Sequence, residues 1–596
     1  MSTQNNRRRD PGGFSAETIL LAAGIVIVIV GVAGLNLAVR LGHQLDGSGV
    51  ELTSDPFGLV FQLFSGKVPW PAAGTWIIAG VGVLVLALVV LILLAVARYR
   101  KRSSRVDRAA SYMGRGKDVE ALSRRNAEAT AQRLGVQDSP GVPIGKTIGG
   151  QPLYGSWEDM HVDIWGPRTG KTTSRAVPAI LAAPGGVLVT SNKRDVVDAT
   201  RDVRAAVGPV WVFDPQAIAL ENPTWWWNPL SYVTDEVKAA RLAEHFAAGS
   251  RDPGAKTDAY FDPAGQDLLA GLLLAAALDH RPITDVYTWL TRPTDESAVD
   301  ILREHGFTLT ADQVAGVVSA PEKQRGGVFG TAQQMASCLT NRQVAAWVTP
   351  QGAADPRPHF DPAAFVRHFG TLYSLSKEGR GTAGPLVTAL TVAVVEAAEE
   401  LASQSSGGRL STPLVGVLDE AANVCRWREL PNLYSHYGSR GIILMTILQS
   451  WSQGVDVWGE SGMKKLWSAS NIKVYGGGVA EDAFLESISK LIGDYDRIAS
   501  TVSTGRGGRG VSSQLHRERI LDVSDLGALP KGRAIVLASG SRPTLIRTQP
   551  WMTGPHADAV RASIAAHDPQ AERTIREAQQ EVAAVAAAEP AQEEAS

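Results

Sequence analysis

The segment 165–173, which reads WGPRTGKTT, constrains the fold of this chain more than any other. A strand-like run, His161 to Trp165, leads into it, and an apolar helical stretch, Thr172 to Ala183, follows it. A glycine-rich turn between a strand and a helix points backbone N–H groups at a phosphate, while the lysine reaches the terminal phosphates and a threonine hydroxyl binds Mg²⁺. The segment therefore predicts a loop that binds ATP and Mg²⁺, in which Thr172 binds the metal. The residues of this loop are Gly166, Pro167, Arg168, Thr169, Gly170, Lys171, Thr172 and Thr173.

The loop departs from the usual phosphate-binding pattern in the position of its first glycine. The pattern G-x-x-x-x-G-K-T requires glycine where Trp165 stands, and this chain has glycine one place later, at Gly166. Two arrangements are open. The turn is re-formed around Gly166 and Pro167, or Trp165 adopts a backbone conformation that glycine takes more easily.

A second motif, 414–420 (LVGVLDE), has the pattern of the metal-binding strand that accompanies such a loop. A buried strand that ends in two carboxylates predicts that Asp419 holds Mg²⁺ and that Glu420 orients and polarises the attacking water. The alternative is that Asp419 caps the helix that follows, and the presence of the phosphate-binding loop favours the metal role. A further buried strand ends at Gln449, for which we predict a sensor of the γ-phosphate, with an exposed glutamine as the alternative.

Strands that alternate with helices indicate an α/β fold with a parallel sheet. The residues from 231 to 355 lack strand patterns and predict an all-α domain inserted into the α/β domain, whereas the glycine- and serine-rich stretch 500–513 predicts a loop. The predicted segments of the cytoplasmic part are a basic connector (98–140), the two parts of a nucleotide-binding domain (141–230 and 356–560), the all-α insertion between them (231–355) and a low-complexity C-terminal tail (561–596).

Two apolar segments near the N-terminus, 18–40 and 75–97, each have about the length of a helix that crosses the hydrocarbon core. Arginines cluster before the first segment and after the second, whereas the loop between them, 41–74, carries a single lysine, Lys67. The positive-inside rule therefore predicts a two-pass protein of the cell membrane with a cytoplasmic N-terminal segment, 1–17, and a cytoplasmic C-terminus.

Composition limits the remaining classes. The formal net charge is −2, so any contact with nucleic acid must come from local patches rather than from global basicity. The two cysteines, Cys338 and Cys425, lie far apart with no Cys or His at ligand spacing, which excludes a disulfide scaffold and a zinc site of the usual spacing.

Together these motifs resemble the type IV secretion coupling proteins, the TraG/TraD-type ATPases of conjugation, which belong to a RecA-like, FtsK-related class. The resemblance covers about 150–551 and rests on WGPRTGKTT, on LDEAANVCRWRELPNLYSHYGSRGIILMTILQS and on LPKGRAIVLASGSRPTLIRTQPW. It implies a RecA-like P-loop sheet with an inserted all-α domain, preceded by two transmembrane helices. It also implies a homo-hexamer that moves DNA, with relaxosome proteins, toward a type IV secretion channel.

The same resemblance implies functional residues beyond the phosphate-binding loop. Glu420 and Gln449 are implied as catalytic, and a neighbouring subunit is expected to supply an arginine finger, for which the candidates are Arg440, Arg517 and Arg519. Contacts with translocated DNA should be mostly to phosphate and insensitive to sequence. The glycine-flanked Arg506 and Arg509 are candidates for this contact, with an ordinary surface loop as the alternative.

Two other functions compete with this reading. An FtsK-like translocase of chromosome partitioning usually has more spans and a C-terminal DNA reader, for which this sequence offers no pattern. A nucleotide-binding scaffold for protein docking would not need Lys171, Thr172, Asp419 and Glu420 together, although Trp165 keeps that alternative open.

Overall fold

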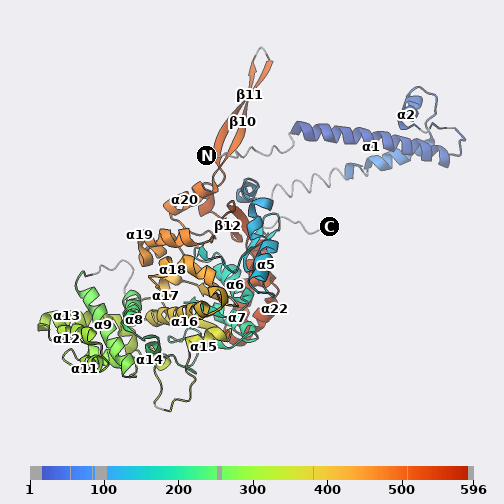
Figure 1. The fold of residues 1–596 in the computed structure, drawn as a ribbon. Coiled ribbons are helices and arrows are strands. Elements are labelled where there is room, and N and C mark those ends of the chain that lie inside the picture. The colour runs from blue at the N-terminus through green and yellow to red at the C-terminus, as the bar shows by residue number, and fades with distance from the viewer. Residues whose placement is uncertain are drawn as a thin grey trace. The chain divides into compact units, whose positions relative to one another are not determined.

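A computed structural model describes residues 16–50, 52–53, 55–83, 85–87, 104–250, 258–352, 354–379, 381–505 and 508–587. The chain divides into two compact units (Figure 1). One unit holds Met1–Arg105, Asp494–Arg519 and Ala588–Ser596, and the other holds Val106–Gly493 and Ile520–Ala587.

An 11-stranded mixed sheet forms the centre of the larger unit, in the order β2-β1-β13-β12-β9-β3-β8-β7-β4-β6-β5. The run from β9 to β5 is parallel, which confirms the α/β class predicted from the sequence, and an antiparallel edge extends it. The parallel strands are β3 (His161–Ile164), β4 (Val187–Ser191), β5 (Val210–Phe213), β6 (Thr371–Leu375), β7 (Leu414–Leu418), β8 (Ile442–Leu448) and β9 (Ile472–Tyr475). The others are β1 (Val142–Thr147), β2 (Pro152–Gly155), β12 (Arg533–Ala538) and β13 (Thr544–Arg547).

Helices cover the parallel part of the sheet. Strands β7 and β8 are buried at every position, as expected of parallel strands that are covered on both faces. Alternate residues of these strands, among them Val415, Val417 and Met445, join one apolar core with residues of the surrounding helices. The helices of this unit include α5 (Arg124–Arg133), α6 (Val177–Ala182), α7 (Asp195–Ala205), α16 (Gly384–Gln404), α18 (Leu430–Tyr437), α19 (Trp451–Ala469) and α20 (Asp482–Ile492).

The chain between β5 and β6 forms a group of helices, drawn in green in Figure 1. No strand occurs among the described residues of 231–355. Within the described parts of the chain, α9 is the one helix that is long and apolar enough to cross a membrane, and half of it is buried. It packs against α8, α11, α12 and α13 as a core helix of this group. The helices are α8 (Glu236–Ser250), α9 (Phe261–Leu278), α10 (Thr284–Leu290), α11 (Ser297–Glu304), α12 (Thr308–Val318), α13 (Glu322–Met335) and α14 (Arg342–Val348).

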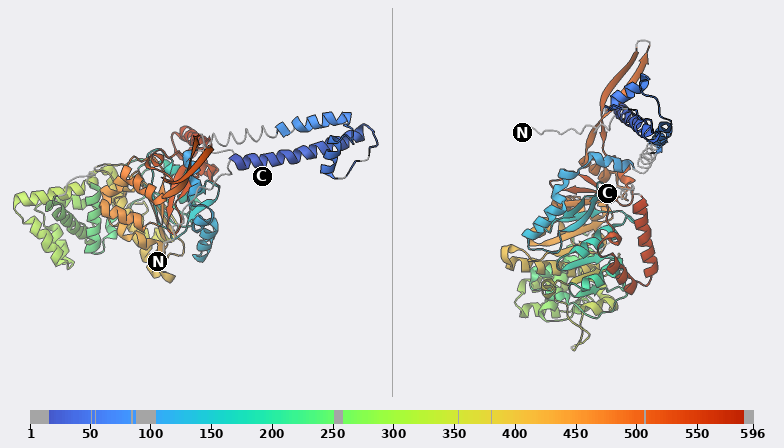
Figure 2. Two further views of the ribbon diagram at one scale, coloured as in Figure 1. Left: turned by 90° about the horizontal axis from the view of Figure 1, so that it is seen from above. Right: turned by 90° about the vertical axis from the view of Figure 1, so that its right-hand side faces the viewer.

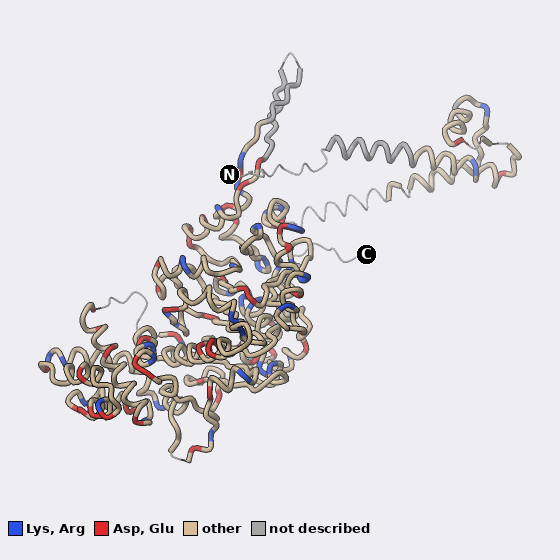
Figure 3. Tube along the Cα trace, in the orientation of Figure 1, with Lys and Arg blue, Asp and Glu red and all other residues tan. Residues whose placement is uncertain are grey.

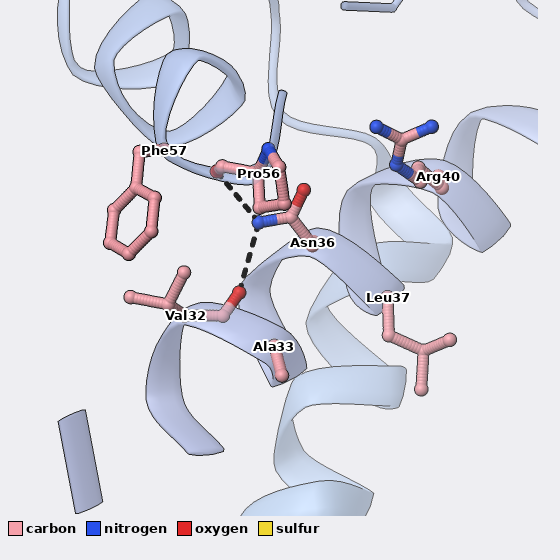
Figure 4. Close-up of a pocket in the computed structure, with 7 residues that line it drawn as sticks. All are labelled: Val32, Ala33, Asn36, Leu37, Arg40, Pro56 and Phe57. Carbon is pink, nitrogen blue, oxygen red and sulfur yellow. Dashed lines mark hydrogen bonds between the residues drawn. The ribbon is translucent and has the colours of Figure 1, made fainter. Parts of the chain in front are cut away.

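The N-terminal part of the smaller unit contains α1 (Ala16–Leu45) and α2 (Pro56–Phe64), which pack on each other. Asn36, a polar residue within the first predicted span, donates hydrogen bonds to the carbonyl oxygens of Val32 (3.0 Å) and Pro56 (2.8 Å) and lines an apolar pocket (Figure 4). The described part of this region carries few charges, whereas both signs are interspersed over the larger unit (Figure 3).

The two membrane spans remain predictions. Helix α1 includes the first predicted span, 18–40, and a helix runs over Ala72–Ala87 at the start of the second. Residue 84 and residues 88–97 of the second span, 75–97, lie outside the described residues.

One expectation about the C-terminal part of the chain was wrong. The described residues of 500–513 form strands and not a loop: β10 (Asp494–Gly505) and β11 (Gly508–Arg519) pair antiparallel, from Asp494 opposite Arg519 to Gly505 opposite Gly508. The glycine content marks the hairpin connection, while the flanking Ser, Thr and Val residues suit extended backbone.

The described part of the predicted C-terminal tail, 561–596, is largely helical. Residues from α22 (Ala557–His567) and α23 (Ala571–Ala587) join the apolar core beside α7, and residues 588–596 lie outside the described part. The apolar residues spaced along one face of these helices, not their overall alanine and glutamate content, decide this packing.

Candidate active site

The order of the strands brings the predicted site residues to one edge of the sheet. Strand β8 lies between β3 and β7, with Ile164 opposite Leu448 and Leu418 opposite Thr446. The loop after β3, Gln449 after β8 and the two carboxylates after β7 therefore leave the sheet at its carboxyl edge. Ligands of open α/β sheets bind at this edge.

Trp165 extends strand β3 and does not line the phosphate-binding loop. Its N–H donates to the carbonyl oxygen of Leu448 at 2.9 Å, and its side chain is fully buried in an apolar core that includes residues of β9 and β12. A Cβ atom on Gly476 would lie 2.0 Å from the Trp165 ring, so only glycine at 476 leaves room for it. The turn is thus re-formed around Gly166, the first of the two arrangements left open by the sequence.

Gly166 is required for close approach of two backbones. Its N–H donates to the carbonyl oxygen of Gly477 at 2.9 Å, and a Cβ atom at Gly166 would lie 2.0 Å from the Gly478 carbonyl oxygen. The glycine triplet after β9, which appears in the sequence as YGGG, thus contacts and supports the loop, and the motif patterns in the sequence did not predict this role.

The rest of the loop turns through left-handed backbone and enters the following helix. Arg168 and Gly170 have φ of +60° and +88°, and the hydroxyl of Thr169 donates to the Gly166 carbonyl oxygen at 2.6 Å. A π-helical turn from Thr172 runs directly into α6. The predicted loop residues therefore form one continuous turn between β3 and a helix.

Lys171 joins the loop to the two carboxylates at the end of β7. Its Nζ lies 3.2 Å from Asp419 Oδ1 and makes a shorter ion pair with Glu420. The side chains of Asp419 and Glu420 are 4% and 1% exposed, so both charges are almost completely removed from solvent. The structure brings together three predicted site residues separated by about 250 positions in the sequence, since Lys171 and Glu420 are 249 apart.

The shared charges shift two pKa values. Burial raises the pKa of Asp419 to about 6, with Glu420 adding to the rise and Lys171 opposing it. Burial lowers the pKa of Lys171, but the attraction of Asp419 and Glu420 outweighs it, so the pKa is raised overall and the lysine stays charged. The cluster is therefore a cation facing two buried acids, one of which can take up a proton in mildly acidic solution.

Glu420 has an unusual backbone conformation that its neighbours hold in place. Its φ of +55° lies in the left-handed region, which is uncommon for a residue other than glycine and is often found at functional sites. Gln449 Nε2 donates to both carboxylate oxygens of Glu420, at 2.7 and 2.8 Å. Of the two alternatives for Gln449, the structure places the amide in the site, beside the carboxylate.

Three further polar residues beside Glu420 were missed from the sequence. Asn423 Nδ2 lies 3.2 Å from Glu420 Oε2 and 2.9 Å from Glu378 Oε1, and Asn192 Nδ2 donates to the same Glu378 oxygen at 2.6 Å. Asn423 lies three positions after Glu420, in the short helix Ala421–Val424 that follows it. Residues three apart on a helix are neighbours, so this spacing in LDEAAN could have predicted the contact between the two side chains. Nothing local in the sequence indicates Glu378, because it follows a different strand.

Of the three arginine-finger candidates, Arg440 lies in the same unit as this cluster but apart from it. Arg440 precedes β8, at the opposite end of that strand from Gln449, and pairs with Glu399 at 3.5 Å. Arg517 and Arg519 lie on β11, where Arg517 pairs with Asp494 at 2.8 Å. Their assignment to a neighbouring subunit stays a prediction.

The DNA-contact candidates fall at the connection between β10 and β11. Arg506 lies outside the described residues, and Arg509 belongs to β11, where it pairs in register with Thr504. The DNA role of both residues stays a prediction.

Comparisons with known proteins agree with the motifs. Residues 413–531 match the family model described as the TraM recognition site of TraD and TraG. No curated protein was found to match the chain. Two solved structures of the conjugative coupling protein TrwB, lacking 70 N-terminal residues in the unbound form, share the fold at a TM-score of 0.50. The unbound monoclinic form is 17% identical and the complex with a non-hydrolysable GTP analogue is 16% identical.

These matches have a wide extent. The TrwB alignments cover 71% of this chain and 91% or 92% of the TrwB chains. The matched segment 413–531 contains the predicted metal-binding strand, Gln449 and the hairpin. The chain thus has a segment similar to the recognition-site domain of TraD and TraG and shares the TrwB fold, which confirms its resemblance to the type IV secretion coupling proteins.

Proposed function

We propose that this chain is a membrane-anchored ATPase that couples ATP hydrolysis to the delivery of DNA, with bound relaxosome protein, into a type IV secretion channel. The observation that carries the proposal is the convergence of Lys171, Asp419, Glu420 and Gln449 at one edge of a sheet with the TrwB fold. The match of 413–531 to a TraM recognition site supports relaxosome proteins as partners.

The residues of the cluster fit ATP with Mg²⁺. Asp419 Oδ1 is buried and has an ion pair with Lys171 but no well-aligned hydrogen bond, so this oxygen is available as an acceptor for a metal-bound water. Asp419 and Thr172 would hold Mg²⁺, and the bound ion would neutralise part of the negative charge of the phosphates. Lys171 would then turn from the carboxylates to the terminal phosphates, and the N–H groups of the loop around Gly170 would bind phosphate oxygens.

Glu420 is the residue best placed to act on the attacking water. Gln449 and Asn423 donate to its carboxylate from two sides, so its oxygens keep their direction when Lys171 moves away. A carboxylate held in this way accepts a hydrogen bond from the attacking water. It thereby aligns a lone pair of the water oxygen with the γ-phosphorus, which lowers the barrier to in-line attack. Asn423 is therefore proposed as a positioning residue, anchored in turn by Glu378.

Several parts of the proposal go beyond the cluster. Two membrane spans, 18–40 and 75–97, would anchor the protein in the cell membrane with both termini in the cytoplasm. A homo-hexamer would allow a neighbouring subunit to supply Arg440, Arg517 or Arg519, and Arg506 and Arg509 would contact DNA phosphates. DNA binding that depends steeply on salt and little on sequence would support the last point.

The test is a conjugation assay in donor cells in which Glu420→Gln replaces the native protein. The variant should still bind ATP but lose at least about 100-fold in hydrolysis and transfer, because the general base is gone. Glu429→Gln, an exposed glutamate on the same segment, is the control and should transfer normally. Unimpaired transfer in a strain lacking the protein would exclude the coupling role, and unimpaired hydrolysis by Glu420→Gln would exclude the assignment of the base.

A further inference from the structure

The C-terminal helix α23 brings a carboxylate to the phosphate-binding loop. Glu581 Oε1 lies 3.2 Å from the hydroxyl oxygen of Thr173, which also lies 3.1 Å from the Gly170 carbonyl oxygen. A Cβ atom on Gly170 would lie only 2.5 Å from the same Glu581 oxygen. The carboxylate therefore rests against the glycine whose missing side chain lets a phosphate approach the loop.

Apolar packing fixes the helix in this position. Ala571, Ile575, Ala578 and Val582 recur at i, i+4, i+7 and i+11 and pack against the core beside the sheet. Glu581 follows Ala578 by three residues, so its side chain projects near the same face. The right-hand view of Figure 2 shows this red helix running along the flank of the larger unit. The packing of α23, rather than attraction between Glu581 and the loop, thus sets where the carboxylate lies.

The Glu581 carboxylate lies where it would meet a phosphate bound to the loop, since it contacts Thr173 and the space beside Gly170. A carboxylate and a phosphate are both anions that accept hydrogen bonds from the same donors, and like charges at contact distance repel strongly in a partly buried site. Glu581 and a nucleotide phosphate therefore compete for Gly170 and Thr173.

We propose that α23 is an autoinhibitory element, in which the Glu581 carboxylate takes the place of a nucleotide phosphate and ATP binds only when this carboxylate has left the loop, which in the wild type requires α23 to move away. This inference rests on the proposed ATPase function and adds a regulation of the same site. The measured dissociation constant for ATP then equals the intrinsic one divided by the fraction of molecules in which α23 is away from the loop. A helix docked in about 90% of molecules weakens the measured affinity about tenfold.

The experiment measures ATP binding, in the presence of Mg²⁺, to the full chain in detergent micelles. Glu581→Ala should bind ATP about 3- to 10-fold more tightly than the wild type, because the competing carboxylate is gone. Glu577→Ala is the matched control: Glu577 lies one turn earlier on the same helix, is 61% exposed and pairs with Arg573. Its ATP affinity should equal that of the wild type.

A second measurement follows the helix itself. Amide hydrogen exchange in 571–587 of the wild type should speed up when ATP is added, since nucleotide binding displaces α23. Equal ATP affinity of the wild type and Glu581→Ala, or exchange in α23 that ATP leaves unchanged, would overturn the inference. If neither protein binds ATP, the proposed ATPase function fails as well. If both bind it equally and Lys171→Ala abolishes binding in each, only the autoinhibition fails.

Discussion

Replacing Lys171 with methionine should destabilise the protein even without nucleotide, because this lysine neutralises two buried acids. Asp419 and Glu420 are 4% and 1% exposed and share the one ammonium group. Removing one partner of a buried ion pair leaves an uncompensated buried charge and costs about 3–5 kcal/mol. The free energy of unfolding of Lys171→Met should therefore fall by about this amount at pH 8.

The same reasoning predicts how this loss depends on pH. The pKa of Asp419 is raised to about 6 in the wild type, and removing the lysine raises it further because the lysine opposes the shift. As the pH falls from 8 to 5, Asp419 takes up a proton and one of the two unbalanced charges disappears. The difference in unfolding free energy between Lys171→Met and the wild type should therefore shrink toward pH 5.

Urea unfolding of the full chain in micelles, followed by tryptophan fluorescence at pH 8 and pH 5, measures these differences. Lys193→Met is the control, since Lys193 is an exposed lysine just after β4 and should cost little. Adding Glu420→Gln to Lys171→Met should restore at least half of the lost stability by removing one buried charge. If Lys171→Met unfolds like the wild type at pH 8, or if the second change destabilises it further, the electrostatic account is refuted.

Three further outcomes are expected. Asn423→Ala should lower kcat for ATP hydrolysis about tenfold and leave KM near the wild-type value, because Asn423 positions Glu420 and does not bind the nucleotide. Steady-state kinetics that show a change in KM alone would contradict this. Since the folded pKa of Asp419, about 6, lies above its ordinary value of 3.8, the proton competes with Mg²⁺ below pH 6. Mg²⁺ titrations of the protein with ATP should show an affinity for Mg²⁺ that falls by up to about tenfold per pH unit below pH 6. An affinity for Mg²⁺ that stays the same from pH 7 to pH 5 would exclude this competition. By linkage, this carboxyl makes the protein without Mg²⁺ less stable as the pH rises from about 4 to 6. Finally, Trp165→Gly restores the usual glycine pattern but should lose about 3–5 kcal/mol of stability without tighter ATP binding, since the ring is fully buried; equal stability with tighter binding would place Trp165 in the loop after all.

The sequence by itself determined the parts of the site that depend on local pattern. A strand, a glycine-rich turn and a helix predicted the loop ending in Gly170 and Lys171, and a buried strand ending in Asp-Glu predicted the partners of that lysine. The end of another buried strand predicted Gln449. These predicted residues come together in the structure because the carboxyl ends of adjacent parallel strands meet at one edge, whichever residues connect them.

Only the tertiary structure decided which distant segments meet. Thr173 and Glu581 are 408 positions apart, and Asn423 contacts Glu378 across two different strand connections, so no local periodicity signals either pair. The sequence left open whether Trp165 lines the loop. Gly476, the first residue after the neighbouring strand β9, decides this because it leaves room for the Trp165 ring outside the loop. Composition misjudged the β10–β11 hairpin, because glycine and serine content describes backbone freedom, whereas pairing between the two strands fixes the conformation.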